Sequence, residues 1–334
     1  MEHGVVVKAD KQPLVSIVTP AYNEEKYLRQ CIESVLSQTY ENWDYSIINN
    51  CSTDRTLDIA KEYCRKDNRI RIYDNEIFVS GVENHNIALS KISQSSKYCK
   101  VVGADDWIYT DCLTRMVEAA EANPTAGIVG AFWIYSELDT DARVPAPVGG
   151  GPGTTLVPGR DMCRLFLMGG PYQFGSPTSL LYRSDLVRNC PNFFDDGVEY
   201  ADLAACLEVL DRYDFAFVPQ ILTFTRTRRE SLYGRAKARG EQYYRILGCL
   251  KRYGSKYLSD EEIETRVQQS LSMYYEFLGS CFYDRRGGEF WDFHRKNMHE
   301  LAGGFCRPRL MTNAAVYAIE VMGRRLRKAI SGSR

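Results

Sequence analysis

The chain has 334 residues, of which 44% are hydrophobic and 25% are charged, and its formal net charge is -1 at pH 7. This composition is typical of a globular protein with a sizeable core. The near-zero net charge argues against a nucleic-acid partner, and no apolar run approaches the roughly 20 residues that cross a bilayer. Residues 1–13 lack the apolar segment of a secretory signal, and the 11 cysteines include no CxxC pair. We therefore expect a reducing compartment and a cytoplasmic protein.

The first part of the chain alternates β-rich segments with segments of helical periodicity. Strands are predicted at 14–20, 43–49, 70–74, 97–104 and 126–135, and helices at 27–36, 52–64, 82–92 and 110–124. Such alternation predicts an α/β fold, a doubly wound and mostly parallel sheet with helices on both faces. We expect Asn23 to cap the first of these helices, and Ser52 with Asp54 to begin the second.

The second part changes character. Residues 136–160 are rich in Pro and Gly, which indicates a loop between two halves. Strands at 177–183 and 215–226 then flank a helix at 199–213, and helices are predicted at 241–253, 260–283, 289–302 and 311–330. We expect a sheet domain over 12–240, with halves at 12–134 and 135–240, and a helical C-terminal region over 241–334. His294 and His299 are five residues apart, which is poor spacing for one helical face, so we expect them on the surface.

Polar residues follow three of the predicted strands where each strand ends, in the segments 20–23, 49–54 and 103–106. Ligands of parallel sheets bind beyond the carboxyl ends of the strands, so these segments should converge. Asp105 and Asp106 are adjacent carboxylates, and Mg²⁺ or Mn²⁺ prefers such oxygen ligands. The alternative is an exposed turn in which Asp106 or Thr110 caps the next helix.

Taken in order, "VSIVTPAYNEEKYLRQCIESVLSQTYENW", "IINNCSTDRT" and "GADDW" resemble the family 2 glycosyltransferases of the GT-A fold. The resemblance covers roughly residues 14–230. It implies inverting transfer of a sugar from a nucleotide-sugar donor, UDP-linked here, to a hydroxyl of a glycan or lipid-linked glycan. It also implies a divalent cation, Mg²⁺ or Mn²⁺, on the donor diphosphate. The alternative function is that of a non-catalytic nucleotide-sugar-binding or scaffold protein of a glycan assembly pathway.

The resemblance assigns the donor to residues 12–134 and the acceptor to 135–240. It makes Asp105 and Asp106 the metal ligands, and Tyr22 would stack on a pyrimidine base. The full set of donor-binding residues that it implies is Pro20, Ala21, Tyr22, Glu24, Asn50, Arg71, Asn86, Asp105, Arg226 and Arg228. The alternatives are an ordinary helix N-terminus at Glu24, surface positions for Arg71 and Asn86, and a solvated basic segment at 226–239.

Three positions depart from the family pattern. Gly103 replaces the first aspartate of D-x-D-D, which removes one potential metal ligand. Asn49 and Asn50 stand where the family has two aspartates, and the amide of Asn50 both accepts and donates, so a uracil base remains compatible. Arg228 takes the place of the histidine in an R-x-H element.

The general base and the membrane contact come from later segments. The family places an acidic residue at the start of the helix near 200, so Asp202 is the first candidate for the base and Glu199 the second, although both also favour the helix dipole. Residues 301–334 carry seven Lys and Arg against one acid, Glu320. This basic, amphipathic end would suit an anionic membrane, and a terminal packing helix is the alternative. An oligomer is compatible with these features.

Overall fold

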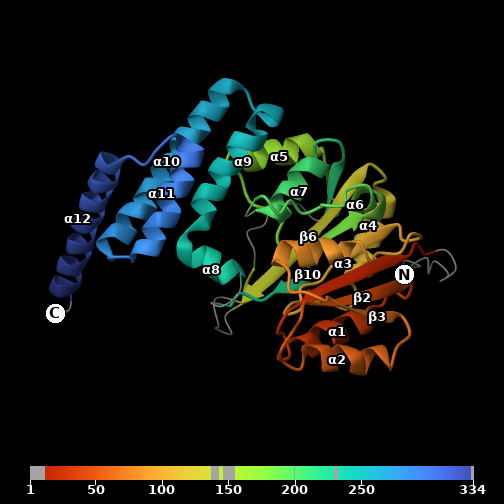
Figure 1. Cartoon of the computed structure of the whole chain (residues 1–334). Helices are drawn as coiled ribbons and strands as arrows, with labels where there is room; N and C mark the ends of the chain where they lie inside the picture. The colour runs from red at the N-terminus through yellow and green to blue at the C-terminus, as the bar shows by residue number, and fades with distance from the viewer. Residues whose placement is uncertain (1–11, 137–142, 146–154, 199, 229–231, 332–334) are drawn as a thin grey trace. The chain divides into compact units, whose positions relative to one another are not determined.

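The computed structural model describes residues 12–136, 143–145, 155–198, 200–228 and 232–331. They form two compact units, which we call the sheet unit (within 12–166 and 170–228) and the helical unit (within 167–169 and 229–331). Figure 1 shows the elements of both units. Much of the Pro/Gly-rich segment 136–160 lies outside the described residues.

The sheet unit is built on one mixed, mostly parallel sheet with the strand order β3-β2-β1-β4-β9-β6-β10-β5. Strands β1, β2, β3 and β4 run parallel, as do β6 and β10, whereas β9 is antiparallel to both of its neighbours. The strands are β1 (Val15–Ala21), β2 (Trp43–Asn49), β3 (Ile70–Asp74), β4 (Tyr98–Val101), β5 (Trp107–Ile108), β6 (Ala126–Ser136), β7 (Arg143–Pro145), β8 (Thr155–Val157), β9 (Leu180–Arg183) and β10 (Asp214–Thr225). The predicted α/β class is confirmed.

Helices cover both faces of this sheet, and in Figure 1 α1 and α2 lie together on one face of β1–β3 while α3 lies on the other. The spacing of Leu28, Cys31, Ile32 and Val35 explains α1, because these four buried side chains form one apolar stripe. The helices are α1 (Leu28–Leu36), α2 (Thr56–Cys64), α3 (Gly81–Leu89), α4 (Cys112–Ala122), α5 (Gly159–Leu167), α6 (Ser184–Arg188) and α7 (Ala201–Val209).

The helical unit contains the four predicted C-terminal helices, which are α9 (Glu241–Tyr257), α10 (Asp260–Tyr283), α11 (Gly288–Ala302) and α12 (Arg307–Ser331). A further helix, α8 (Leu232–Arg239), precedes them in a basic segment where no helix is predicted. A capping box between Ser259 and Glu262 begins α10. The core of this unit is rich in aromatic residues, among them Tyr244, Tyr274 and Tyr275. No helix within the described ranges is long and apolar enough to cross a membrane.

The expectation that His294 lies on the surface is wrong. Its side chain is fully buried in the helical unit, where Nδ1 lies 2.5 Å from the hydroxyl of Tyr274. The rings of Phe290 and Phe293 pack against the imidazole. Burial lowers the pKa of His294 to about 4, so the ring is neutral at pH 7. His294 is buried because aromatic side chains surround it, and the i,i+5 spacing to His299 gives no indication of those neighbours.

Candidate functional site

The loops that follow the first strands meet at one edge of the sheet, as the sequence predicts. Within the parallel ladder Ala21 lies opposite Asn49, and Asn49 lies opposite Asp74. On the other side of β1, Val18 lies opposite Val101, so the carboxylate turn also begins at this edge. The segments 20–25, 49–55, 74–79 and 102–106 therefore leave the sheet side by side.

Hydrogen bonds link the loop after β1 to the loop after β2. The backbone N–H of Glu24 donates to the hydroxyl of Thr56 at 2.7 Å. The N–H of Glu25 donates to the carboxylate of Asp54 at 3.0 Å, and Oε2 of Glu25 accepts from the backbone of the second loop in return. The two loops are therefore held together, and this linkage fixes the backbone of Glu24.

Asn23 takes part in this linkage and does not cap a helix, so that prediction is wrong. Its backbone is left-handed, with φ 53°, and its Oδ1 accepts from the N–H of Thr53 at 2.8 Å. Helix α1 begins only at Leu28, with no side-chain cap. Asn is one of the few residues with a side chain that tolerate this conformation, and the side chain is used between the loops.

Asp106 is a buried carboxylate at the end of the turn, with 5% of the residue exposed. Its Oδ2 accepts from the hydroxyl of Thr178 at 2.6 Å, and its Oδ1 accepts from the backbone N–H of Arg226 at 2.8 Å. Burial, followed by the charge of Asp105, raises the pKa of Asp106 well above its usual value. Helix α4 begins at Cys112, so the alternative in which Asp106 caps this helix is wrong.

Gly103 gives Asp106 the space that it occupies. A Cβ at Gly103 would lie 2.9 Å from Oδ2 of Asp106, closer than side-chain atoms pack. The N–H of Gly103 donates to the hydroxyl of Thr178 at 3.0 Å, and that hydroxyl in turn donates to Asp106. The glycine at position 103 therefore leaves the space that the Asp106 carboxylate fills.

Lys100 lies beneath this turn and is a residue that the sequence analysis missed. It is fully buried in β4, and its ammonium donates to the backbone carbonyls of Thr178 at 2.7 Å and Leu180 at 3.1 Å. Burial lowers the pKa of Lys100. The sequence does contain an indication of this role, since Lys100 is a charged residue in the middle of an apolar strand. A charged side chain is buried at such a position only where hydrogen-bond partners are present. Lys100 therefore fixes the segment that carries the Thr178 hydroxyl.

Arg228 lies between two carboxylates. Its Nη2 is 2.5 Å from Oε1 of Glu24 and 2.8 Å from Oδ2 of Asp105. Burial and the charge of Asp105 raise the pKa of Glu24 to about 7, against the lowering effect of Arg228. The other oxygen of Glu24, Oε2, is buried and has no hydrogen-bond partner among the described residues.

Arg226 joins the same cluster from the end of β10. Its Nε donates to the backbone carbonyl of Asp105 at 3.1 Å, and its guanidinium lies 4.2 Å from the ring centroid of Tyr27. The stacked rings of Trp107 and Phe224, with centroids 3.4 Å apart, join β5 to β10 beside it. The structure thus brings Glu24, Asp105, Asp106, Arg226 and Arg228 together.

A second group surrounds Tyr22, beyond the buried Pro20 and Ala21. The ring of Tyr22 is 45% exposed and lies 4.8 Å from the ring of Phe78, which is 59% exposed. The amide of Asn50 is buried and pairs with both backbone groups of Val79, at 3.0 Å and 2.9 Å. Asn50 therefore holds the loop that presents Phe78 beside Tyr22.

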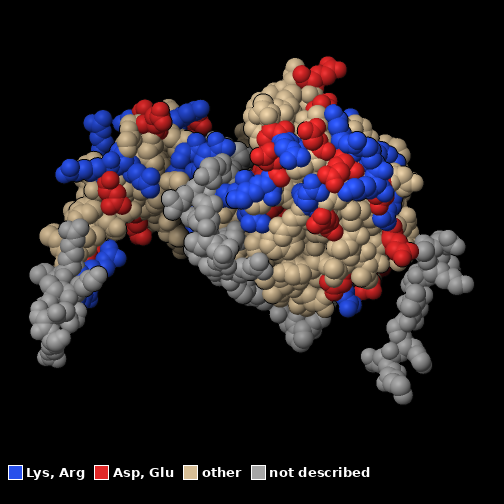
Figure 2. Space-filling view, turned by 90° about the horizontal axis from the view of Figure 1, so that it is seen from below, with Lys and Arg blue, Asp and Glu red and all other residues tan. Residues whose placement is uncertain are grey.

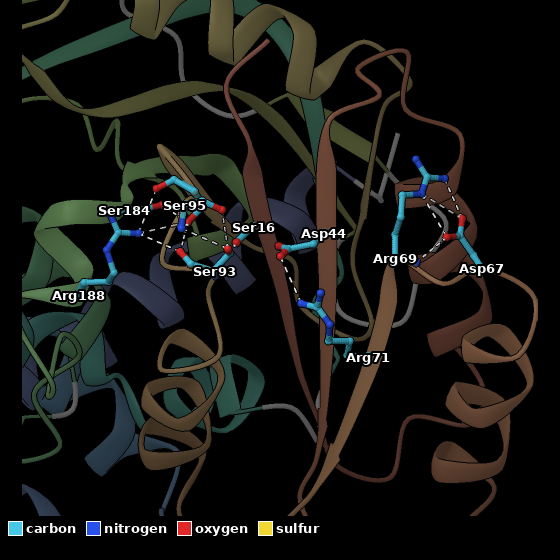
Figure 3. A network of polar contacts seen from close by, with 10 residues as sticks. Ser16, Asp44, Asp67, Arg69, Arg71, Ser93, Ser95, Ser184 and Arg188 are labelled. Atoms are coloured by element: carbon cyan, nitrogen blue, oxygen red, sulfur yellow. Dashed lines mark hydrogen bonds and ion pairs between the residues drawn. The ribbon is translucent and has the colours of Figure 1, made fainter. Parts of the chain in front are cut away.

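Arg71 does not join these residues. Ser16, Asp44 and Arg71 are each the second residue of their strand, at the end of the sheet opposite the carboxylates. Figure 3 shows Arg71 directed toward Asp44, and their ion pair measures 3.3 Å. In the same view Ser93 lies beside Ser16, to which its N–H donates. Arg71 thus belongs to a polar network at the amino ends of the strands.

Asn86 and Asp202 lie in a third neighbourhood. The amide of Asn86 in α3 pairs with both backbone groups of Phe194, at 2.7 Å and 2.9 Å. Asp202 is in the first turn of α7, where its carboxylate accepts from the N–H of Leu203, and its charge acts on the imidazole of His85. Glu199 lies outside the described residues.

The donor set of the site is compatible with a hard divalent cation. Asp105 and Glu24 present carboxylate oxygens to one position, and Oε2 of Glu24 is a buried oxygen that lacks a donor in the described part of the chain. Both oxygens of Asp106 already accept protein hydrogen bonds. Within the described ranges no group of three or more His, Cys, Asp or Glu side chains forms a preassembled metal cage. A cation here would therefore share its coordination with ligand oxygens or water.

Comparisons with known proteins place the chain in a family. The model of the family described as "Glycosyl transferase family 2" matches residues 16–189. A curated relative, glycosyltransferase GlyG of Streptococcus pneumoniae, is 28% identical over 126 residues, which are 38% of this chain and 41% of that protein. The match spans less than half the length of the first curated relatives.

Solved structures share the fold. TarS residues 1–349 of S. aureus, in complex with UDP-GlcNAc, superpose with a TM-score of 0.65 and 16% identity, over 86% of this chain and 80% of that one. The mannosyltransferase PcManGT from Pyrobaculum calidifontis, in complex with GDP-Man and Mn²⁺, gives a TM-score of 0.56 and 12% identity, over 94% of this chain and 87% of that one.

The hydroxyl of Thr178 should carry a measurable part of the stability of the sheet unit. Thr178→Val keeps the shape but leaves the buried carboxylate of Asp106 and the N–H of Gly103 without a partner. We expect a loss of about 1–3 kcal/mol in the free energy of unfolding by urea. Thr178→Ser keeps the hydroxyl and is the matched control, with a smaller loss. Equal losses in both variants would show that the hydroxyl does not support the turn.

Proposed function

The chain belongs to glycosyl transferase family 2, and we propose that it transfers a sugar from a UDP-linked donor to a hydroxyl of a glycan or lipid-linked glycan. The observation that supports this most is the meeting of Glu24, Asp105, Arg226 and Arg228 at the carboxyl ends of parallel strands. A nucleoside diphosphate leaves as a concentrated anion, so its departure needs cations held at fixed positions. This edge of the sheet supplies them.

The donor base would lie at Tyr22, at the end of β1. Tyr22 and Phe78 offer exposed aromatic surface next to the carboxylate turn, and aromatic rings accept a flat base by stacking. Asn50 supports this surface from beneath, so its contribution is to position the 75–79 loop. UDP is the nucleotide of the TarS complex and GDP that of the PcManGT complex, and TarS has the higher TM-score of the two. We therefore propose uracil as the base.

Asp105 and Glu24 are the residues that would hold Mg²⁺ or Mn²⁺, with Asp106 keeping the turn in place through its two hydrogen bonds. The cation, when bound, neutralises charge on the diphosphate leaving group. Direct coordination by Asp106 remains a prediction of the sequence. Arg226, fixed by its contacts to Asp105 and Tyr27, would add positive charge on the same side.

Asp202 is our proposed general base, with Glu199 as the second candidate. The acceptor oxygen forms a bond to the anomeric carbon while the bond from that carbon to the diphosphate oxygen breaks. The proton of the acceptor hydroxyl passes to the carboxylate, and the configuration inverts. Asp202 lies in the first turn of α7, the position at which the family pattern places the acidic residue.

We also propose that α12 contacts an anionic membrane, which would bring the chain to a lipid-linked acceptor on the cytoplasmic side. One side of α12 packs on α10 through Leu310 and Ala314, whereas Met311, Ile319 and Met322 are at least half exposed. Figure 2 shows Lys and Arg side chains on the surface of the helical unit, with some Asp and Glu among them. Apolar side chains beside basic ones are typical of helices that lie in a membrane interface.

UDP should stabilise the folded chain in the presence of Mn²⁺, and GDP and ADP should not. A ligand at 100 times its Kd adds about 2.7 kcal/mol, which raises the thermal midpoint by several degrees. Asp105→Asn should remove most of the shift, whereas Asp58→Asn, the same change on the exposed face of α2, should leave it intact. No shift with any nucleotide would contradict the donor assignment.

Turnover separates the enzyme from a non-catalytic nucleotide-sugar-binding or scaffold protein. We expect slow release of UDP from UDP-sugars without acceptor, because water replaces the acceptor hydroxyl. Asp202→Asn should lower the rate by about 10²–10⁴ while UDP still shifts the thermal midpoint. Asp196→Asn, an exposed neighbour, is the control. Binding of UDP without any turnover would favour the non-catalytic reading, and an unchanged rate in Asp202→Asn would exclude this residue as the base.

The chain should co-sediment with vesicles that contain anionic lipid and not with neutral ones, and less so at high salt. Replacing both Ile319 and Met322 with Ser should abolish sedimentation, because it removes exposed apolar surface from α12. Ile221→Ser, at an exposed position in the sheet unit, should have no effect. Equal binding of the wild type and the double variant would contradict the role of α12.

A further inference from the structure

The Arg228 guanidinium occupies a position that is defined by two carboxylates from distant parts of the chain. Its Nη2 lies 2.5 Å from Glu24 and 2.8 Å from Asp105, and its Nε lies 3.1 Å from the same Asp105 oxygen. The three side chains are only 14% to 20% exposed. At such burial, solvent screens the charges less than at an open surface.

Two carboxylates that both contact one guanidinium nitrogen would repel each other if no cation lay between them. Oxygen atoms of carboxylates also suit a hard divalent cation, and Oε2 of Glu24 lacks a donor among the described residues. The position between Glu24 and Asp105 therefore suits either a cationic side chain that can extend to it or a free divalent cation. A guanidinium brings one positive charge to it, and a divalent cation brings two.

Arg226 shows that the segment carrying Arg228 has other attachments. The backbone N–H of Arg226 donates to Asp106, and its guanidinium lies over Tyr27 and donates to the backbone of Asp105. These contacts do not involve the side-chain oxygens of Glu24 and Asp105 that Arg228 binds. The Arg228 side chain can therefore leave its position while the ties at Arg226 persist.

We propose that Arg228 and a divalent cation are alternative occupants of the position between Glu24 and Asp105, so that cation binding displaces the guanidinium. This inference rests on the proposed function and adds a control of metal loading to it. The displaced guanidinium stays close to the carboxylate turn and becomes a second positive charge for the donor diphosphate. In the absence of donor and metal, the singly charged guanidinium of Arg228 therefore occupies the position. It gives the position up when the donor and the divalent cation bind together.

Direct measurement of Mn²⁺ binding tests the exchange without turnover. The free Mn²⁺ signal in electron paramagnetic resonance gives the affinity of the full chain in the absence of nucleotide. Arg228→Gln should bind Mn²⁺ about tenfold more tightly than the wild type, which corresponds to about 1.4 kcal/mol. Arg228→Lys keeps the charge without the planar fork and should fall between the two. Arg71→Gln removes the same charge from the opposite end of the sheet and should match the wild type.

A second variant makes the result independent of any general effect of losing Arg228. Glu24→Gln should weaken Mn²⁺ binding, and in that background Arg228→Gln should increase it by a smaller factor than in the wild type, because Asp105 is then the one carboxylate that Arg228 and the cation still share. Thermal midpoints and far-ultraviolet circular dichroism confirm that each variant is folded. Arg228→Gln with wild-type or weaker affinity for Mn²⁺ would overturn the exchange.

The failure of this inference can be told apart from the failure of the proposed function. Stabilisation by UDP, measured with Mn²⁺ and with chelator, reports donor binding independently of Arg228. A chain that UDP stabilises but that binds no Mn²⁺ in any variant keeps a donor site and overturns the exchange. A chain that binds Mn²⁺ more tightly as Arg228→Gln, yet is not stabilised by any nucleotide, supports the exchange and overturns the donor assignment.

Discussion

The structure of the site depends on the burial of one carboxylate, that of Asp106. A charged or protonated carboxyl group is costly inside a protein unless donors meet its oxygens. Here the donors are the hydroxyl of Thr178 and the backbone N–H of Arg226, from segments more than 70 residues away in the chain. Lys100 holds the Thr178 segment in place by its carbonyls. The requirement to satisfy Asp106 therefore brings β4, β9 and β10 to a common point.

The carboxylates around this point differ in their exposure to solvent, and Asp106 is the most buried of them. Asp106 is satisfied by neutral donors and has a raised pKa, whereas Asp105 and Glu24 are further out and share Arg228. The arrangement separates two tasks that a pair of adjacent aspartates would otherwise combine. The inner carboxylate shapes the turn, and the outer one is directed to charged partners. In the exchange proposed above, the outer charges change partners while the turn stays in place.

Sequence reasoning reached the α/β class and the convergence of three strand ends, because hydrophobic periodicity and the topology of parallel sheets are local or general properties. It did not reach contacts made by unusual backbone or by distant segments. Asn23 was predicted as a cap because its side chain suits one, but the left-handed backbone turns it toward Thr53. Asn50 was assigned to a ligand, yet Val79 uses its amide. The antiparallel β9, inserted between β4 and β6, carries no local signal of its register.

Gly103 also limits which substitutions the carboxylate turn can accept. Because a Cβ there would meet Oδ2 of Asp106 at 2.9 Å, a side chain at position 103 requires the Asp106 carboxylate, and with it the hydrogen bond to Thr178, to shift. Substitutions at these three positions are therefore not independent, and their order matters. Gly103→Asp alone would therefore displace the carboxylate that accepts from Thr178 and Arg226. The Asp106 carboxylate therefore disfavours any side chain at position 103, because its hydrogen bonds to Thr178 and Arg226 oppose the shift that a Cβ would require.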